Sequence, residues 1–327
     1  MIIKLFNGKN LLFQFVLMLV FFISMANREI ILQEPNGFGP LYNLIYDFLE
    51  GNSILIYLSF ISLILIEGIL LQLIVSMYKL VSRNNYIVIF VWFLLIFSNP
   101  TLASINPVII STTLITWALF QLFAITENVN PLPNIFTVGF IISFASLIYG
   151  NLILYSFFLI IALLTLSLFN ARALAVSFLS LSAPYIYYFT YLFVSDQALD
   201  TTKLFLFSFE KWSFFQNGAL LWISISITAI LFIISIISIF EVLTHLNSKL
   251  IQTRTAVMVL FAWLLTSIIL MVVSGAWWFA HPILIFVPMA ILTSIFLDEQ
   301  KNTIYYDIAI ISLLALEILQ LYMPNNA

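Results

Sequence analysis

Long apolar runs separated by short polar breaks cover most of the chain. A helix needs about 20 mostly apolar residues to cross the hydrocarbon core of a bilayer, and eleven runs are candidates. They lie near residues 10–26, 53–78, 86–98, 107–125, 135–149, 152–169, 173–194, 218–240, 255–274, 276–297 and 304–322. The pattern predicts an all-α, polytopic transmembrane helical bundle with about 11 spans, in a range of roughly 9 to 12.

Two of these runs are short. Only about 12 clean apolar residues precede Asn99-Pro100 in the run near 86–98, fewer than a span requires, and the run near 135–149 is similarly brief. Both can be full spans, or tilted, re-entrant or broken helices. Irregular backbone is tolerated at membrane depth only where protein or a water-filled cavity covers it.

Two segments outside the spans have a pattern of their own. In "PLYNLIYDFLEGN" the residues Leu41, Leu44, Ile45, Phe48 and Leu49 recur at helical spacing opposite polar positions, which predicts an amphipathic helix on the membrane surface that stops at Gly51. The segment "DTTKLFLFSFEKWSFFQNG" predicts a second interfacial helix, with a strand as the alternative because "LFLFSF" alternates. We therefore expect one integral membrane domain, 1–327, with interfacial segments near 27–52 and 195–217.

Basic residues orient the bundle. With a cytoplasmic N-terminus, eight Lys and Arg residues lie inside and three outside, as the positive-inside rule requires. The inner group is Lys4, Lys9, Lys79, Arg83, Arg172, Lys249, Arg254 and Lys301, and the outer group is Arg28, Lys203 and Lys211. The first run also resembles a cleavable signal peptide, although we favour an uncleaved span. Both alternatives place the segment that begins at residue 27 on the outer side of the membrane. We expect this membrane to be a bacterial cytoplasmic (inner) membrane.

The composition agrees with lipid as the solvent. Hydrophobic residues make up 63% of the chain and charged residues 8%, whereas a soluble domain is about 25% charged. The net charge of −3 gives no reason to expect nucleic acid as a partner. The absence of cysteine excludes disulfides, thiolate metal sites and cysteine nucleophiles. We expect no cofactor and no metal, and we expect membrane lipid as the partner, with a lipid-linked substrate or another membrane protein as additions.

Glu67, in "LILIEGILLQL", is an ionisable residue about fifteen positions into its span. Such groups are expensive near the bilayer centre and usually face a cavity or a partner. One interpretation is a proton, cation or polar-substrate site. The other is a neutral carboxylic acid that is hydrogen-bonded to a neighbouring helix.

The two histidines are predicted to lie on opposite faces of the membrane. His281 lies near the outer surface in "SGAWWFAHPILIFVPMAI", where it is a candidate general base. The alternative is a helix-end anchor that bonds a carbonyl freed by Pro282 or Pro288. His245 lies in an inner loop, so the two side chains cannot ligate one metal.

The outer loops hold the remaining candidates. Glu29 and Glu34 are candidate catalytic bases, and Arg28 could clamp a phosphate or bind a head group. Glu210 and Lys211 in the second loop are further substrate-binding candidates. The alternative for all of them is a solvated rim of the membrane domain.

The segments "MYKLVSRNNYIVIFVWFLL", "FTVGFIISFASLIYG" and "FNARALAVSFLSLSAPYIYYF" resemble a family of functionally uncharacterised bacterial inner-membrane proteins, which sometimes carry the label β-carotene monooxygenase. The resemblance covers about half of the chain and transfers no functional residue. The carotenoid label does not suit this sequence, because an iron-dependent cleavage enzyme needs several histidines at one site.

Three functions remain open, and whether the protein is an enzyme remains open with them. The first is an enzyme of envelope assembly that acts on a lipid-linked saccharide or lipid head group, with a layout like that of membrane glycosyltransferases and polymerases. The second is a non-enzymatic membrane subunit or scaffold. The third is a transporter or flippase that uses Glu67, with interrupted spans around Pro100 and Pro107.

Overall fold

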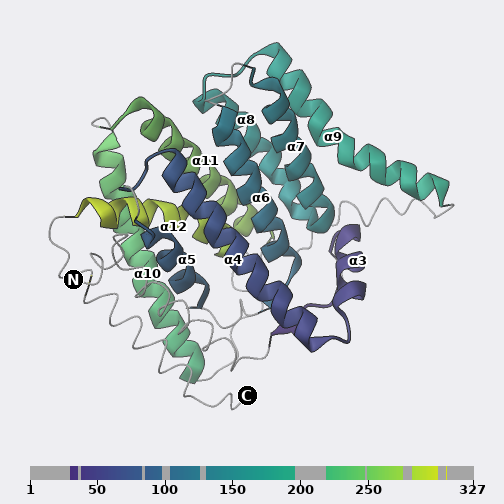
Figure 1. The fold of residues 1–327 in the computed structure, drawn as a ribbon, viewed down its shortest axis with the longest axis horizontal. Coiled ribbons are helices and arrows are strands. Elements are labelled where there is room, and N and C mark those ends of the chain that lie inside the picture. Colours follow the sequence, from purple (N-terminus) through teal and green to yellow (C-terminus); the bar gives the residue numbers. More distant parts are fainter. Residues whose placement is uncertain are drawn as a thin grey trace.

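Helices make up nearly all of the regular structure in the computed structural model (Figure 1). It describes residues 30–35, 38–82, 85–97, 104–125, 130–195, 219–246, 249–274, 282–300 and 307, with the backbone alone for 219–228. In chain order the elements are β1 (Ile31–Leu32), α3 (Pro40–Leu49), α4 (Ser53–Met77), α5 (Ile87–Phe97), β2 (Ser104–Ile105), α6 (Pro107–Ala124), α7 (Leu132–Ile148), η3 (Gly150–Leu154), α8 (Tyr155–Thr165), α9 (Ala171–Val194), α10 (Ala219–Thr244), α11 (Ile251–Ser274) and α12 (Pro282–Glu299). The all-α prediction is confirmed for these residues.

Five of the described helices are long and apolar enough to cross a membrane, namely α4, α6, α9, α11 and α12. This part of the chain therefore belongs to a helical membrane protein with several candidate spans in contact with lipid. The total of eleven spans and the cytoplasmic N-terminus stay predictions. The predicted spans near 10–26 and 304–322 lie outside the described residues, except for Asp307.

Asparagine side chains cap the N-termini of the helices in three of the predicted spans. Asn52 accepts a hydrogen bond from the Leu55 N–H, Asn106 from the Ile109 N–H and Asn170 from the Ala173 N–H, at 3.2, 2.8 and 2.8 Å. Each bond satisfies a backbone donor that has no partner within the helix. Pro107 therefore starts α6 rather than interrupting a span, because the first helical position needs no N–H donor.

Two other predicted spans differ in length from their apolar runs. The run near 135–149 forms α7, which begins earlier, at Leu132, and has 17 residues. The run near 152–169 is divided, because η3 precedes α8 and α8 ends at Thr165. The apolar run does not mark this division, because Leu152, Ile153 and Leu154 of η3 continue into the apolar residues of α8.

The short helix α5 lies in the centre of the packing. All eleven of its residues are buried, and it packs against α4 and α12. At 1.5 Å per residue α5 is about 16 Å long, whereas the hydrocarbon core is about 30 Å thick. The run near 86–98 is thus helical as predicted, but α5 alone does not cross the membrane.

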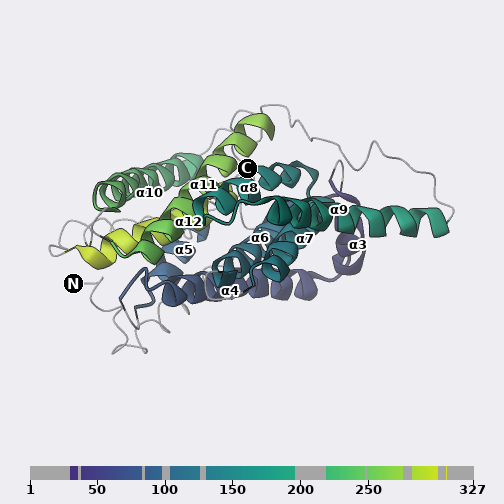
Figure 2. The same cartoon turned by 90° about the horizontal axis from the view of Figure 1, so that it is seen from above.

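α9 packs on α7 along one narrow face and extends past the rest of the bundle (Figures 1 and 2). Its buried face is made mostly of small residues, among them Ala173, Ser177 and Ser180. Its other face exposes large residues such as Phe178 and Tyr187, which are 75% and 70% exposed. Small residues let two helix backbones approach closely, and the exposed face suits lipid.

Candidate functional site

A strap formed by residues 30–35 crosses one end of the bundle. β1 pairs in parallel with β2, and the Gln33 N–H donates to the Ile105 carbonyl oxygen at 3.0 Å. The Tyr42 hydroxyl from α3 lies 2.7 Å from the Gln33 carbonyl oxygen and 3.2 Å from that of Ile105. Burial raises the pKa of Tyr42 above its ordinary value. Tyr42 therefore fastens α3 and the strap to the segment before α6.

Gly39 brings the start of α3 against the end of α7. Its N–H donates to the Ile148 carbonyl oxygen at 3.0 Å. A Cβ atom at this position would lie 2.1 Å from the Leu147 carbonyl oxygen, well inside van der Waals contact. Only glycine permits this approach, so α3 is fixed to the bundle at both Gly39 and Tyr42.

α3 is the predicted amphipathic helix, and it ends as expected. Gly51 follows it with φ +81°, a conformation that favours glycine. Leu44 and Phe48 are 65% and 72% exposed, while Leu49 is buried. The apolar face is therefore divided between the bundle and the exterior, and the fully buried residue is Tyr42, which the apolar pattern does not include.

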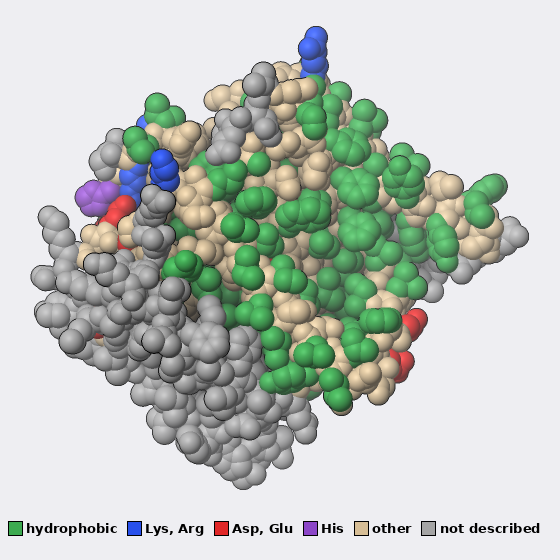
Figure 3. All heavy atoms as spheres, viewed as in Figure 1, with side chains coloured by type: hydrophobic (Ala, Val, Ile, Leu, Met, Phe, Trp, Pro, Cys, Tyr) green, Lys and Arg blue, Asp and Glu red, His purple; other side chains and the backbone are tan. Residues whose placement is uncertain are grey.

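Carboxylates gather beside Tyr46 on α3. The Tyr46 hydroxyl donates to Glu50 Oε1 at 3.4 Å. Partial desolvation, and then the negative charges of Glu50, Glu34 and Asp47, raise the pKa of Tyr46. Figure 3 shows acidic side chains at the lower right margin, where α3 lies in Figure 1, beside a broad hydrophobic surface. This end of the described structure is acidic next to an apolar face.

A groove runs between α3 and α4 at the same end. Its volume is about 460 Å³, and its walls are almost entirely apolar. Leu44 and Phe48 of α3, Ser59 and Leu63 of α4, Ile105 of β2 and Ile110 of α6 are among the lining residues. The groove is open rather than enclosed.

Glu67 occupies a second site, about 20 Å along α4 from the start of that helix. Its side chain is 2% exposed, and the Thr116 hydroxyl of α6 donates to Glu67 Oε1 at 2.5 Å. Thr113, one turn earlier on α6, is a second hydroxyl neighbour of the carboxyl group. The adjoining Gly68 packs against Ile89 and Trp92 of α5, at 3.6 Å from the position a Cβ would take. A carboxyl group is thus enclosed where α4, α5 and α6 meet.

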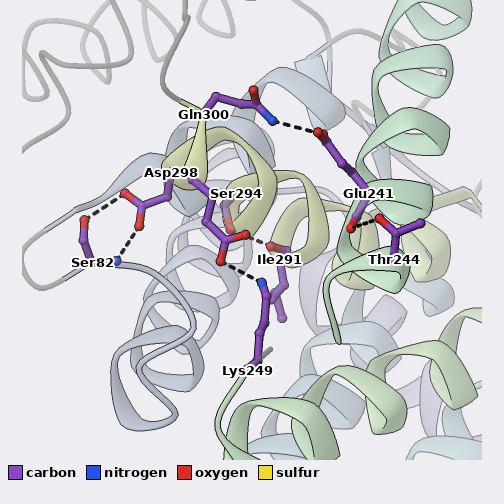
Figure 4. A network of polar contacts seen from close by, with 9 residues as sticks. Ser82, Glu241, Thr244, Lys249, Ile291, Ser294, Asp298 and Gln300 are labelled. Carbon is purple, nitrogen blue, oxygen red and sulfur yellow. Dashed lines mark hydrogen bonds and ion pairs between the residues drawn. The ribbon is translucent and has the colours of Figure 1, made fainter. Parts of the chain in front are cut away.

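The opposite end of the bundle is held together by polar contacts (Figure 4). Asp298 of α12 accepts hydrogen bonds from the Ser82 N–H, the Ser82 hydroxyl and the Asn85 amide, at 2.6, 2.8 and 2.7 Å. Lys249 forms an ion pair with Glu299 at 2.7 Å, and Gln300 donates to Glu241 at 3.0 Å. The end of α12 is therefore tied to the α4–α5 connection, to α10 and to the start of α11.

The structure describes two of the predicted site residues. Glu34 is exposed beside α3, and Glu67 is buried at the second site, so the structure does not bring these two together. Arg28, Glu29, Glu210, Lys211 and His281 lie outside the described residues. Among the described residues, no three His, Asp or Glu side chains form a group that could hold a metal ion.

The sequence interpretation missed the partners of these groups. Thr113 and Thr116 were not singled out, although the run "STTLIT" places hydroxyls at helical spacing inside an apolar span. Asp298 was missed as well, because an acidic residue at a helix end is ordinary in sequence. Tyr42 had no distinguishing signal, since tyrosine is common at membrane surfaces.

Comparison with known proteins gives no further assignment, because no protein-family model, curated protein or solved structure matches the chain. The resemblance to bacterial inner-membrane proteins therefore remains a prediction from the sequence.

Proposed function

We propose that the protein acts on a lipid-linked saccharide, or on another lipid head group, at the membrane surface where α3 lies, during assembly of a bacterial envelope glycan. The observation that carries the proposal is α3 itself. This helix is fastened to the bundle by Tyr42 and Gly39, and it exposes apolar Leu44 and Phe48 as well as the carboxylates of Asp47 and Glu50 on its polar face. A lipid substrate needs such a boundary, where its chain and its head group meet different surroundings.

The carboxylates suit the chemistry of sugars. A carboxylate can accept hydrogen bonds from sugar hydroxyls, and it can act as a general base toward a hydroxyl nucleophile. Glu34 is the described residue to which the proposal gives this role, because it is exposed next to α3. The proposal adds Glu29, Arg28 and His281 on the strength of the sequence alone, together with the outer face of a bacterial cytoplasmic membrane as their location.

The proposal predicts that Glu34→Gln blocks the reaction while leaving the fold intact. General-base catalysis contributes about 10²–10⁴-fold to a rate, so lipid-linked saccharides should accumulate in cells that carry only this variant. Mass spectrometry of extracted lipids measures these pools. Glu241→Gln is the matched control, because Glu241 is a carboxylate at the opposite end of the bundle. Unchanged pools of lipid-linked saccharide in the Glu34→Gln cells would contradict the proposal.

A second candidate function is a proton-coupled carrier, and the burial of Glu67 is the observation that favours it. A carrier needs an ionisable group inside the bundle that can gain and lose a proton. The carrier function predicts the opposite effects for the substitutions of Glu34 and Glu67. Glu67→Gln would abolish uptake or export of the cargo into membrane vesicles, and Glu34→Gln would have a mild effect. If both variants keep full function and a second membrane protein co-purifies, the protein is a non-enzymatic subunit or scaffold.

A further inference from the structure

The surroundings of Glu67 decide whether this buried acid can release a proton. Its side chain is 2% exposed, and α5 encloses it from one side. The Trp92 indole N–H of α5 donates to the Ile64 carbonyl oxygen at 3.4 Å, one turn before Glu67. A carboxylate in such a place is costly unless a positive charge or hydrogen-bond donors compensate for the lost water. The compensation has to come from the residues that contact the carboxyl group.

No positive charge compensates Glu67 among the described elements around it. Neither α4 nor any of the elements packed against it, namely α3, α5, α6, α12 and β2, contains Lys, Arg or His. The titratable side chains of these elements lie toward the two ends of α4. They are Tyr42, Tyr46 and Asp47 of α3, Tyr57 of α4, and Asp298 and Glu299 of α12.

Two threonines of α6 supply hydroxyl groups instead. Thr116 donates to Glu67 Oε1 at 2.5 Å. The Thr113 hydroxyl adjoins the same carboxyl group, and its proton is directed to the Ile109 carbonyl oxygen at 3.1 Å. A hydroxyl group has one proton and two lone pairs, and it can rotate. Thr113 can therefore accept a hydrogen bond from the neutral acid, or turn its own proton toward the ionised carboxylate.

This rotation leaves no backbone group without a partner. Within an α-helix the carbonyl of residue 109 accepts a hydrogen bond from the N–H of residue 113. Ile109 lies inside α6, so its carbonyl keeps this bond when the Thr113 hydroxyl turns away. The site thus has a donor in reserve for the state in which Glu67 has lost its proton.

The same groups are too few for a metal ion. Ca²⁺ and Mg²⁺ take about six or more oxygen ligands, whereas one carboxyl group and two hydroxyl groups meet here. Within the described ranges, no three acidic or histidine side chains form a group that could hold a metal. A proton needs a single acceptor, so it is the cation that suits this site.

We infer that the junction of α4, α5 and α6 is a reversible proton-binding site, in which Glu67 carries the proton and the Thr113 hydroxyl changes its hydrogen-bond partner when the proton leaves. The proton passes from the carboxyl group to solvent. The Thr113 hydroxyl then breaks its bond to the Ile109 carbonyl and donates to the carboxylate. Thr113 is a positioning residue in this exchange. The inference goes beyond the proposed function and rests on neither candidate function, because it involves neither the surface of α3 nor any cargo.

Infrared spectroscopy of the full-length protein tests the site. A protonated carboxylic acid has a C=O stretching band that a carboxylate lacks, and the difference between the wild type and Glu67→Gln isolates this band from those of the other acids. The purified protein in lipid vesicles is titrated over the pH range in which it stays folded. The band of Glu67 should be present at the acid end of this range and should be replaced by carboxylate bands at the alkaline end.

Two adjacent threonines provide matched variants. Thr112 and Thr113 are both buried, and each donates its hydroxyl to the carbonyl four residues earlier, but Thr113 is the one that adjoins Glu67. Thr113→Val should raise the midpoint of the titration by about one pH unit, because the ionised state loses a stronger hydrogen bond than the neutral state does. Thr112→Val should leave the midpoint unchanged. Thr113→Ser keeps the hydroxyl and should titrate like the wild type.

Three outcomes would overturn the inference. One is a band of Glu67 that does not change with pH, because the site would then not exchange its proton. Another is an equal shift of the midpoint in Thr112→Val and Thr113→Val, or a shift in Thr113→Val that Thr113→Ser fails to reverse. The third is a midpoint that depends on the concentration of sodium or calcium ions at constant ionic strength, which would assign the site to a metal cation. The proposed function is unaffected by any of these results, since its test is the Glu34→Gln variant.

Discussion

Glu67 shows what a single polar residue requires inside a helical membrane protein. An ionised carboxylate in an apolar interior is costly unless a positive charge or several donors accompany it. Neither α5 nor α6, which both pack around it, carries a titratable side chain. The Thr113 hydroxyl donates to the Ile109 carbonyl oxygen at 3.1 Å, so its oxygen is left to accept a proton from the acid. The arrangement fits a neutral carboxylic acid between two hydroxyl groups.

Substitutions of Glu67 should differ in their effect on stability, depending on whether they keep both hydrogen bonds. Glu67→Gln retains an oxygen that accepts from Thr116 and supplies an amide N–H that can donate to Thr113, so the stability should stay within about 1 kcal/mol of the wild type. Glu67→Ala leaves buried hydroxyl groups without their partner and should cost about 1–3 kcal/mol. Thermal unfolding in detergent measures both. Equal losses in the two variants would contradict this account.

At the residue scale, the sequence identified Glu67 but could not identify its partners. A carboxyl group in an apolar run is visible at once, whereas Thr116 lies 49 residues later on another helix. Glu34 was likewise visible as an exposed acid, but its place beside Tyr46 depends on the pairing of β1 with β2. Each of these strands has two residues, too few for any alternating pattern to predict their register.

Among the elements, the contact between α7 and α9 depends on small residues. A Cβ atom on Gly139 would lie 1.9 Å from Ser180 Oγ and 2.9 Å from Ser180 Cβ. The Ser143 hydroxyl also donates to the Leu181 carbonyl oxygen at 2.5 Å, and the hydroxyls of Ser146 and Tyr185 lie 2.7 Å apart. Close backbone approach and hydrogen bonds between helices are two of the forces that associate helices in lipid.

Gly139→Ala should therefore separate the two helices. The added methyl group cannot be accommodated without moving α9, and overpacking of this kind costs about 1–3 kcal/mol. Gly68→Ala in α4 is the control, because its nearest neighbours would lie at 3.6 Å and alanine favours a helix by about 0.5–1 kcal/mol. Unfolding in detergent gives both values. Ser180→Gly should restore stability to Gly139→Ala, and an absence of rescue would show that the contact is not the cause.

Helix starts that carry a capping residue were predictable, whereas burial was not. Asn106 followed by Pro107 marks the start of α6 in sequence, because both residues suit the first turn of a helix. The sequence could not show that α5 is enclosed by protein. Its residues "IVIFVWFLLIF" are all apolar, and an apolar side chain is equally stable against lipid and against another helix. The hydrophobic period that reveals the buried face of a soluble helix is therefore absent.

For the whole molecule, the junction around Asp298 connects segments that are far apart in the sequence. Its three hydrogen bonds reach the α4–α5 connection, more than 200 residues earlier in sequence. The neighbouring Lys249–Glu299 pair is different in kind, because half of the Glu299 side chain is exposed. Hydrogen bonds to a charged group contribute about 1.5–3 kcal/mol, whereas exposed ion pairs contribute about 0–1 kcal/mol.

Substitution of these two adjacent acids should give unequal results. Asp298→Ala removes the acceptor of all three bonds and should destabilise the protein by roughly 1.5–3 kcal/mol. Glu299→Ala removes one surface ion pair and should cost less than about 1 kcal/mol. Both changes remove one negative charge from the same turn of α12, so each controls for the other in a thermal unfolding experiment. A larger effect of Glu299→Ala would reverse the assignment.

The enclosure of α5 also has a consequence for how the protein is made. α5 is synthesised early, yet one of the two helices that cover it most extensively is α12, which begins at Pro282. Until translation has produced α12, the side of α5 that packs against α12 lacks this partner. A helix of eleven residues is too short to be held in the bilayer by hydrophobic length alone. The final packing of α5 is therefore completed only after α12 has been made, late in biogenesis.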